Sequence, residues 1–328
     1  MDTPALTFPS FAPRAPWWGA DLQTVRLFFL GRPVDFSNFR GSTVRLPLGD
    51  GSGDALAGRL HVPQAPTQRP LAVLIHGLSG CEESLYIQNT ALRLLTEGYP
   101  VLRLNLRGAG RSRPLCRQHY HAGKSEDLVS VLAALPAHLR SHGVVMVGYS
   151  LGGNLLLKFL GEGGERCGGV RAAVSVSAPI DLFAAAARIS ARRNLVYHRY
   201  MLQRIKQERS APPADLTAAE RAAIAEVRSI PEFDERVTAP RNGYSSAADY
   251  YARSSALPLL DSIRVPTLVI HAQNDPWIPA ASYLGYDWRR NPHLHPLLPK
   301  SGGHIGFEGR DSRIPWHDRC ISAFLSGL

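Results

Sequence analysis

The pentapeptide GYSLG at positions 148–152 restricts the possible fold of this chain more than any other segment does. An apolar run with β-branched residues, 144–147, precedes it, and an apolar segment typical of a buried helix, 153–160, follows it. A Gly-x-Ser-x-Gly turn between a strand and a helix is so tight that only glycine fits beside the serine. Because 29 of the 328 residues are glycine, an idle turn of this sequence could arise by chance, so the rest of the chain must decide. In this context the turn predicts Ser150 as a nucleophile.

A serine hydroxyl is a weak nucleophile at neutral pH and needs a general base, usually a histidine oriented by a carboxylate. Asp275 follows a strand-like run at 265–271, and His304 lies in a glycine-rich loop behind a short strand expected at 297–300. Taken singly, Asp275 is an ordinary turn residue before proline and His304 a loop histidine without a partner. Their order after Ser150, each behind a strand, predicts a Ser-His-Asp triad. Asp181 is an alternative acid, because it too follows a strand.

The chemistry also needs backbone N–H groups that stabilise the oxyanion of a tetrahedral intermediate. One such donor is the residue after the nucleophile, and the second comes from the loop after the third strand. The sequence His-Gly-Leu at 76–78 follows a buried strand at 71–75. We therefore expect the N–H groups of Leu78 and Leu151 to form the oxyanion hole. His76 is expected to pack beneath the loop and shape it, without acting as a base.

Together these segments resemble an α/β-hydrolase of the YheT-like branch, the family that also holds eukaryotic abhydrolase-domain lipases and yeast medium-chain acyl esterases. The resemblance covers nearly the whole chain from residue 16. It implies a serine hydrolase of carboxylic esters with the triad at Ser150, Asp275 and His304. The segments that carry it are LQT (22–24), IHGLSG (75–80), LNLRG (104–108), GYSLGGN (148–154), FD (233–234) with TAP (238–240), DYY (249–251), NDP (274–276) and GGHIGF (302–307).

The order of strand-like and helical patterns predicts an α/β fold with a mostly parallel central sheet flanked by helices. A hairpin around 49–53 comes first, and strands then alternate with helices. Helical patterns alone follow, at 184–209 and at 216–228, where Thr217 and Glu220 form a capping-box signature. We expect an N-terminal arm packed on the core (1–40), an α/β-hydrolase catalytic domain (41–180 and 261–328) and a helical lid between strands six and seven (181–260).

Two segments are candidates for the entrance to the site. The first expected lid helix carries seven basic residues beside apolar ones, which indicates an amphipathic helix with a solvated basic face. A sharper interpretation is a cationic, apolar-lined entrance that recruits anionic or lipid-like esters. The arm up to residue 33 is rich in proline and aromatic residues, and we expect Trp17 and Trp18 near the mouth of the cleft; its alternative role is a peripheral membrane contact. The seven basic residues are Arg188, Arg192, Arg193, Arg199, Arg204, Lys206 and Arg209.

Charge, apolar runs and cysteine spacing narrow the class of protein further. The formal net charge is +10, but the arginines are spread along the chain and no nucleic-acid motif accompanies them, so a nucleic-acid partner is not expected. The apolar cluster at 27–30 is far shorter than the ~20 residues of a membrane span, and no secretory signal is evident. The four cysteines lack metal-site spacing, so we expect free thiols in the cytoplasm, no metal and no cofactor.

The sequence thus predicts an esterase that cleaves small-molecule esters of short-to-medium acyl chains through an acyl-enzyme. Three alternatives keep the same triad: transfer of the acyl group to an alcohol, amide hydrolysis, and lipase action on monoacylglycerol or phospholipid. A non-catalytic binding protein of this fold would normally have lost a triad residue, and Ser150, Asp275 and His304 are all present. The oligomeric state is left open.

Overall fold

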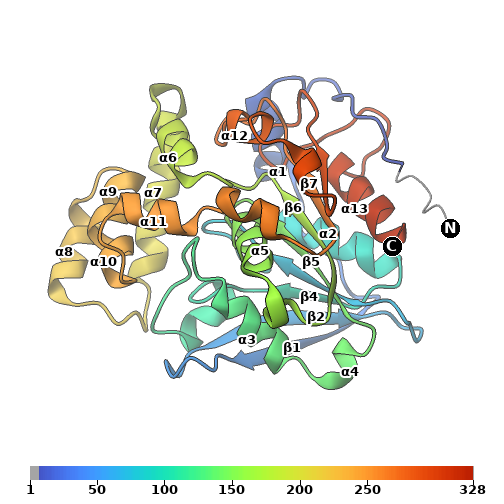
Figure 1. Cartoon of the computed structure of the whole chain (residues 1–328), viewed down its shortest axis with the longest axis horizontal. Helices are drawn as coiled ribbons and strands as arrows, with labels where there is room; N and C mark the ends of the chain where they lie inside the picture. Colours follow the sequence, from blue (N-terminus) through green and yellow to red (C-terminus); the bar gives the residue numbers. More distant parts are fainter. Residues whose placement is uncertain (1–6, 328) are drawn as a thin grey trace.

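The computed structural model describes residues 7–327, and an eight-stranded sheet lies at their centre (Figure 1). The strand order is β1-β2-β4-β3-β5-β6-β7-β8. The six strands from β3 onward run parallel to one another, whereas β2 pairs antiparallel with β1 and with β4. The strands are β1 (Arg40–Pro47), β2 (Ala55–Val62), β3 (Leu71–Ile75), β4 (Val101–Leu104), β5 (Val144–Tyr149), β6 (Val170–Val176), β7 (Thr267–Ile270) and β8 (Leu294–Leu297). The mostly parallel sheet agrees with the prediction from the alternating patterns.

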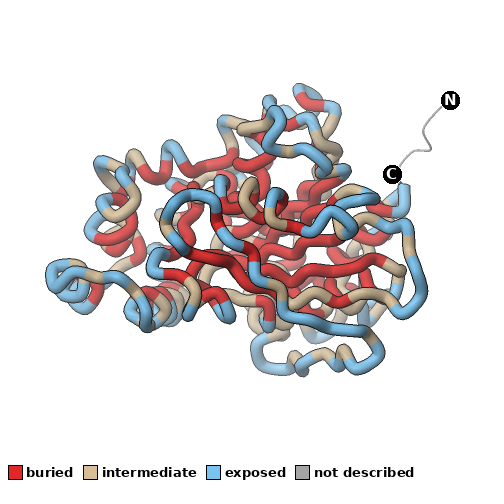
Figure 2. The backbone as a smooth tube through the Cα atoms, turned by 90° about the horizontal axis from the view of Figure 1, so that it is seen from below, coloured by how far each residue is buried: buried red, intermediate tan, exposed pale blue. Residues whose placement is uncertain are grey.

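Helices cover both faces of the sheet, so its central strands are buried on both sides. One face packs against α2 (Leu85–Thr96) and α13 (Trp316–Ser326), and the other against α3 (Glu126–Ala134) and α5 (Leu151–Glu162). Successive residues of β3 contribute to opposite layers, because side chains alternate along a strand. In Figure 2 the strands form a buried centre surrounded by exposed loops. Such burial explains why β3 and β5 are continuous apolar runs in the sequence.

The chain between β6 and β7 is helical, as expected, and gathers at one end of the molecule, on the left in Figure 1. Its elements α6–α11 span residues 182–254 and are called the inserted helices below. They enclose a small apolar core of their own, which includes Ile189, Leu202 and Phe233. The elements are α6 (Leu182–Ser190), α7 (Leu195–Ser210), α8 (Ala218–Glu226), α9 (Ile230–Phe233), a π-helical turn (Asp234–Thr238), α10 (Ala239–Arg241) and α11 (Ala247–Ser254).

Several element boundaries differ from those expected. The prediction of a single helix over 184–209 is wrong. α6 ends at Ser190, a short 3-10 turn (Arg192–Asn194) follows, and α7 begins at Leu195. The break is held by the buried side chain of Asn194, whose amide donates to the carbonyl oxygens of Arg188 and Pro276, each at 2.8 Å. The last strand ends at Leu297, where it was expected to begin. The capping box of Thr217 and Glu220 is present at the start of α8.

The remaining short elements lie in the connections between these. They are α4 (Ala137–Arg140), α12 (Ala281–Leu284) and the 3-10 turns Gly110–Leu115, Gly164–Cys167, Leu257–Ser262 and Trp288–Arg290. α3 and α4 are separate helices, because the chain is extended at Leu135 and Pro136 between them.

The arm contains a helix that the sequence did not predict, α1 (Ala20–Leu30). Part of the expected arm, residues 1–6, lies outside the described residues. The fully buried side chain of Gln23 fixes α1 to the chain near Glu308: its amide donates to the carbonyl of Glu308 at 3.2 Å and accepts from the N–H of Glu308 at 2.7 Å. Arg14 and Arg26 pair with the Glu308 carboxylate at 2.5 and 2.6 Å. The arm is therefore tied to the segment that carries His304.

Candidate active site

Ser150 lies in a strained turn between β5 and α5, with φ of 50° and ψ of −122°. Glycine is required on both sides of it. A Cβ on Gly148 would lie 2.5 Å from the carbonyl oxygen of Gly152, and a Cβ on Gly152 would lie 2.4 Å from the carbonyl oxygen of His76. A left-handed backbone at a non-glycine residue costs energy and is often found at functional sites. The local sequence therefore folds as the tight strand-to-helix turn that presents the serine hydroxyl.

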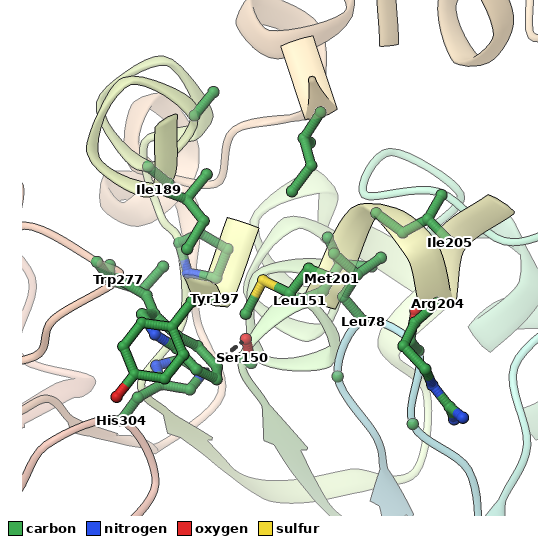
Figure 3. Close-up of a pocket in the computed structure, with 18 of the residues that line it drawn as sticks. Leu78, Ser150, Leu151, Ile189, Tyr197, Met201, Arg204, Ile205, Trp277 and His304 are labelled. Carbon is green, nitrogen blue, oxygen red and sulfur yellow. Dashed lines mark hydrogen bonds between the residues drawn. The ribbon is translucent and has the colours of Figure 1, made fainter. Parts of the chain in front are cut away.

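The structure brings Ser150, His304 and Asp275 together from three loops at the carboxyl edge of the sheet. Figure 3 shows the imidazole of His304 beside Ser150. The Nε2 atom of His304 lies 3.1 Å from the Oγ atom of Ser150, and its Nδ1 atom lies 2.8 Å from the Oδ2 atom of Asp275. Both side chains of the His-Asp pair are buried. This arrangement orients the imidazole with one nitrogen on the carboxylate and the other on the hydroxyl.

The carboxylate of Asp275 is kept ionised by its surroundings. Burial alone would raise its pKa, but His304 beside it and the N–H of Trp277 hold the pKa below its usual range. The Oδ1 atom accepts from the N–H groups of Trp277 at 2.8 Å and Ile278 at 3.0 Å. These bonds leave Oδ2 to the imidazole, so that the orientation of the carboxylate is fixed.

Asp181, the alternative acid, serves a different purpose. It caps the first turn of α6, where its side chain accepts from the N–H of Ala184 at 3.1 Å. The hydroxyl of Ser282 lies 3.4 Å from its other oxygen. Of the two acids considered from the sequence, Asp275 is the one that contacts His304.

The two expected oxyanion donors lie beside the serine. Among residues 7–327, neither the N–H of Leu78 nor that of Leu151 has a hydrogen-bond partner. The loop of Leu78 approaches the nucleophile closely, because a Cβ on the preceding Gly77 would lie 2.9 Å from the Cβ of Ser150. Two tyrosines hold this loop: the hydroxyl of Tyr86 accepts from the N–H of Gly77 at 3.0 Å, and the hydroxyl of Tyr120 accepts from the N–H of Ser79 at 2.7 Å.

His76 supports the same loop from below. Its Nε2 atom accepts from the N–H of Leu106 at 3.0 Å, and its Nδ1 atom lies 2.8 Å from the carbonyl oxygen of Gly77. The ring is fully buried, and this burial lowers its pKa to about 4. A neutral ring with one donor and one acceptor matches these two contacts. His76 therefore shapes the loop, as the sequence indicated.

Thr24 is a residue that the analysis of the catalytic motifs missed. Its hydroxyl accepts from the N–H of His304 at 2.8 Å and donates to the carbonyl of Ala20 at 2.8 Å. The glycines around His304 permit this approach, since a Cβ on Gly303 would lie 2.5 Å from the carbonyl oxygen of Ala20. The signal was present in the LQT segment at 22–24, which was recognised only as part of a resemblance.

A cavity of about 420 Å³ opens above Ser150 between the sheet, α1 and the inserted helices. Figure 3 shows Met201 pointing toward Ser150, with Ile189 and Ile205 on opposite sides of the space. Leu27 and Phe28 of α1 line it, whereas Trp17 and Trp18 are not among the lining residues, so their position near the mouth stays a prediction. The apolar lining includes Leu78, Leu151, Leu182, Ile189, Met201, Ile205, Ile230, Phe233 and Trp277.

Two other properties bear on the class of site. Within residues 7–327, no group of three or more histidine, cysteine or acidic side chains is arranged to hold a metal ion. Over the same residues, no helix has the length and apolar character needed to cross a membrane.

Comparison with known proteins identifies relatives. The family model for the alpha/beta hydrolase fold matches residues 70–311. YheT of Escherichia coli (strain K12), which carries a provisional esterase name, is 34% identical over 323 residues, covering 93% of this chain and 92% of its own. The medium-chain fatty acid ethyl ester synthase/esterase 2 of Saccharomyces cerevisiae is 28% identical over 283 residues, covering 78% of this chain and 62% of its own. In structure, an esterase of Pyrococcus furiosus superposes with a TM-score of 0.59 at 15% identity, over 98% of this chain and 97% of that one.

Proposed function

Because this chain belongs to the α/β-hydrolase family and is a carboxylic ester hydrolase, we propose that Ser150, His304 and Asp275 form its catalytic triad. The observation that carries the proposal is the position of His304, whose two ring nitrogens lie 3.1 Å from the Ser150 hydroxyl and 2.8 Å from the Asp275 carboxylate. A histidine in this position serves as general base to the hydroxyl while the carboxylate fixes its tautomer.

In the first half of the reaction, the Ser150 hydroxyl oxygen attacks the ester carbonyl carbon and its proton passes to Nε2 of His304. The N–H groups of Leu78 and Leu151 donate to the oxyanion of the tetrahedral intermediate. The ionised Asp275 stabilises the imidazolium, which then protonates the departing alkoxide. The alcohol leaves, and the acyl group remains on Ser150.

In the second half, a water molecule takes the place of the alcohol. His304 removes its proton, the resulting hydroxide attacks the acyl-enzyme carbonyl, and the same N–H groups stabilise the second oxyanion. Collapse of this intermediate returns the proton to Ser150 and releases the carboxylic acid. The atoms balance as ester plus water giving acid plus alcohol, and no step needs a cofactor.

The cavity supports esters of short-to-medium acyl chains as substrates. Its volume of about 420 Å³ lies toward the smaller end of ligand sites, which span roughly 300–1,000 Å³. The predominantly apolar walls favour an apolar acyl chain over a charged substituent. Each methylene buried there contributes up to about 0.8 kcal/mol to the binding free energy. We propose the inserted helices as the lid over this chain, since Ile189, Met201 and Ile205 all come from them.

Acyl transfer to an alcohol is a second candidate activity. The yeast relative is named both a synthase and an esterase of medium-chain ethyl esters. Transfer uses the same acyl-enzyme, with an alcohol in place of water in the second half. Its product would be a new ester, so product analysis with added ethanol separates it from hydrolysis.

Labelling by a fluorophosphonate probe tests the triad directly. The wild-type protein should be labelled at Ser150 and should hydrolyse p-nitrophenyl octanoate, while Ser150→Ala should do neither. Ser141→Ala, a change of an exposed serine on another surface, is the matched control and should behave as wild type. Labelling at a different serine, or turnover by Ser150→Ala equal to that of wild type, would contradict the proposal.

A further inference from the structure

Large apolar side chains are exposed at the mouth of the cavity, on two neighbouring helices. On α1, Phe28 and Phe29 are 67% and 70% exposed, and Val196 on α7 is 81% exposed. Side chains of this size rarely remain in water as a group unless they contact something else. We call the set the mouth patch, and its members are Leu22, Phe28, Phe29, Leu30, Leu195, Val196 and Tyr200.

Ring contacts connect the patch across the two helices. The rings of Phe28 and Tyr200 meet edge to face at 5.9 Å, and Phe28 contacts Phe29 in the same way at 5.1 Å. Asp21 of α1 links the two helices, because it pairs with Arg193, just before α7, at 2.6 Å and accepts from the Tyr197 hydroxyl of α7 at 3.0 Å. The two helices therefore present their apolar side chains together.

The patch also adjoins the catalytic cavity, because two of its members, Phe28 and Tyr200, line it. Leu27 and Phe28 border the cavity from α1, and Tyr197, Tyr200 and Met201 border it from α7. A ligand surface pressed against the patch would therefore meet the opening above Ser150. This position distinguishes the patch from scattered exposed apolar residues elsewhere on the surface.

Unpaired positive charge lies along the edges of the patch. Arg32 follows α1, Arg192 precedes α7, and Arg199 adjoins Tyr200; all three are exposed. Within the described part of the chain, none of these three arginines has an ion-pair partner. The whole protein carries a formal net charge of +10. The combination of exposed aromatic residues and arginine is that of proteins which lie on the surface of an anionic bilayer.

We propose that the mouth patch docks the enzyme on an anionic lipid membrane, so that esters dissolved in the bilayer enter the cavity without crossing water. A second copy of the chain fits less well, because it would bring the same arginines face to face and close both entrances. Phe28, Phe29 and Val196 would insert among the lipid headgroups, while the arginines contact their phosphates. The delivery of substrate rests on the proposed esterase function, whereas the docking itself does not.

Co-sedimentation of the full chain with vesicles of phosphatidylcholine, with and without phosphatidylglycerol, tests the docking. Wild type should bind the anionic vesicles, and added salt should weaken the binding because it screens the charges. Phe29→Ser combined with Val196→Ser should weaken it about tenfold or more. These two residues do not border the cavity, so hydrolysis of the water-soluble ester p-nitrophenyl butyrate should be unchanged.

Two controls match these changes elsewhere on the surface. Ile314→Ser removes an exposed apolar side chain outside the patch, and Arg45→Glu reverses a charge on β1; both should bind as wild type. Arg199→Glu should weaken binding to anionic vesicles only. Equal sedimentation of wild type and the double variant, or no sedimentation of wild type, would overturn the proposal. A wild-type dimer in light scattering that the double variant converts to monomer would instead identify the patch as an interface between copies and would also overturn it.

Discussion

The hydroxyl of Thr24 receives a hydrogen bond from the backbone N–H of His304, at 2.8 Å, across 280 positions of the chain. The contact joins helix α1, which carries no group of the proposed triad, to the loop that supplies the proposed general base. Thr24 is thus a positioning residue, and its removal is expected to change the reaction through His304.

Replacement of Thr24 by valine keeps the shape of the side chain and removes the acceptor. A buried N–H left without a partner costs about 1–3 kcal/mol, so we expect kcat to fall by roughly 5-fold to 150-fold as His304 moves from its alignment. Thr24→Ser retains the hydroxyl and should restore most of the rate. Steady-state kinetics with p-nitrophenyl butyrate measure both. Equal rates for the two variants would mean that the hydrogen bond does not position the base.

The choice of triad acid gives a second prediction. Asp275→Asn removes the charge that stabilises the imidazolium and favours the wrong tautomer, so kcat should fall by about 10⁴-fold. Asp181→Asn should lose only part of the cap of α6, with kcat close to wild type. The comparison needs only kcat and a melting temperature for each variant. If Asp181→Asn proved the more damaging change, the role of Asp275 would have to be abandoned.

The cavity gives a third prediction, on chain length. Across p-nitrophenyl esters, kcat/KM should rise from acetate, reach its maximum between butyrate and octanoate, and fall for palmitate, because methylenes contribute only while the cavity has room. Ile189 and Ile205 lie on opposite sides of this space in Figure 3. Ile189→Trp and Ile205→Trp each fill one side of the cavity. The substitution on the side that holds the acyl chain should move the maximum to shorter esters. A profile that neither substitution alters would show that the chain binds elsewhere.

The residues of the proposed triad could be located from the sequence because each follows a strand, and the carboxyl ends of parallel strands meet at one edge of the sheet. Ser150, Asp275 and His304 needed no knowledge of side-chain packing, only the order of strands and turns. The same reasoning placed Leu78 behind β3.

The contacts of α1 could not be inferred in this way. Gln23 is held by two hydrogen bonds to Glu308, and Thr24 accepts one from His304; both partners lie nearly the whole chain away, and no periodic pattern records them. The break between α6 and α7 was missed for a similar reason. Asn194 fits a helix by its local pattern. The chain turns there because its side-chain amide binds two carbonyl oxygens, that of Arg188 nearby and that of Pro276 far along the chain.

The acid sensitivity of the fold gives a fourth prediction. Burial lowers the pKa of His76 from its ordinary value of 6.5 to about 4. The unfolded chain therefore binds a proton that the folded chain does not between these two pH values. The stability that His76 contributes is fully present above pH 6.5 and is lost as the pH falls toward 4.

Urea unfolding at pH 7.5 and 4.5 measures this loss. The contribution of His76 to the loss of unfolding free energy should be about 2–3 kcal/mol. Because glutamine cannot titrate in this range, the unfolding free energy of His76→Gln should fall by that much less than the wild-type value on acidification. His61 and His271, whose pKa values burial also lowers to about 4, add to the total in both proteins. An identical pH dependence in wild type and variant would exclude His76 as a source of the effect.

Helix α1 has only one buried residue, Gln23, whereas the central strands are buried along their whole length. Segments with so little buried surface open at a lower free energy than the rest of a protein. Opening of α1 would release the loop of His304 from Thr24 while the sheet stays folded. On heating, therefore, the enzyme should lose activity at a lower temperature than the one at which the sheet unfolds. Its inactivation temperature would then depend on a small surface helix and not on the stability of its core.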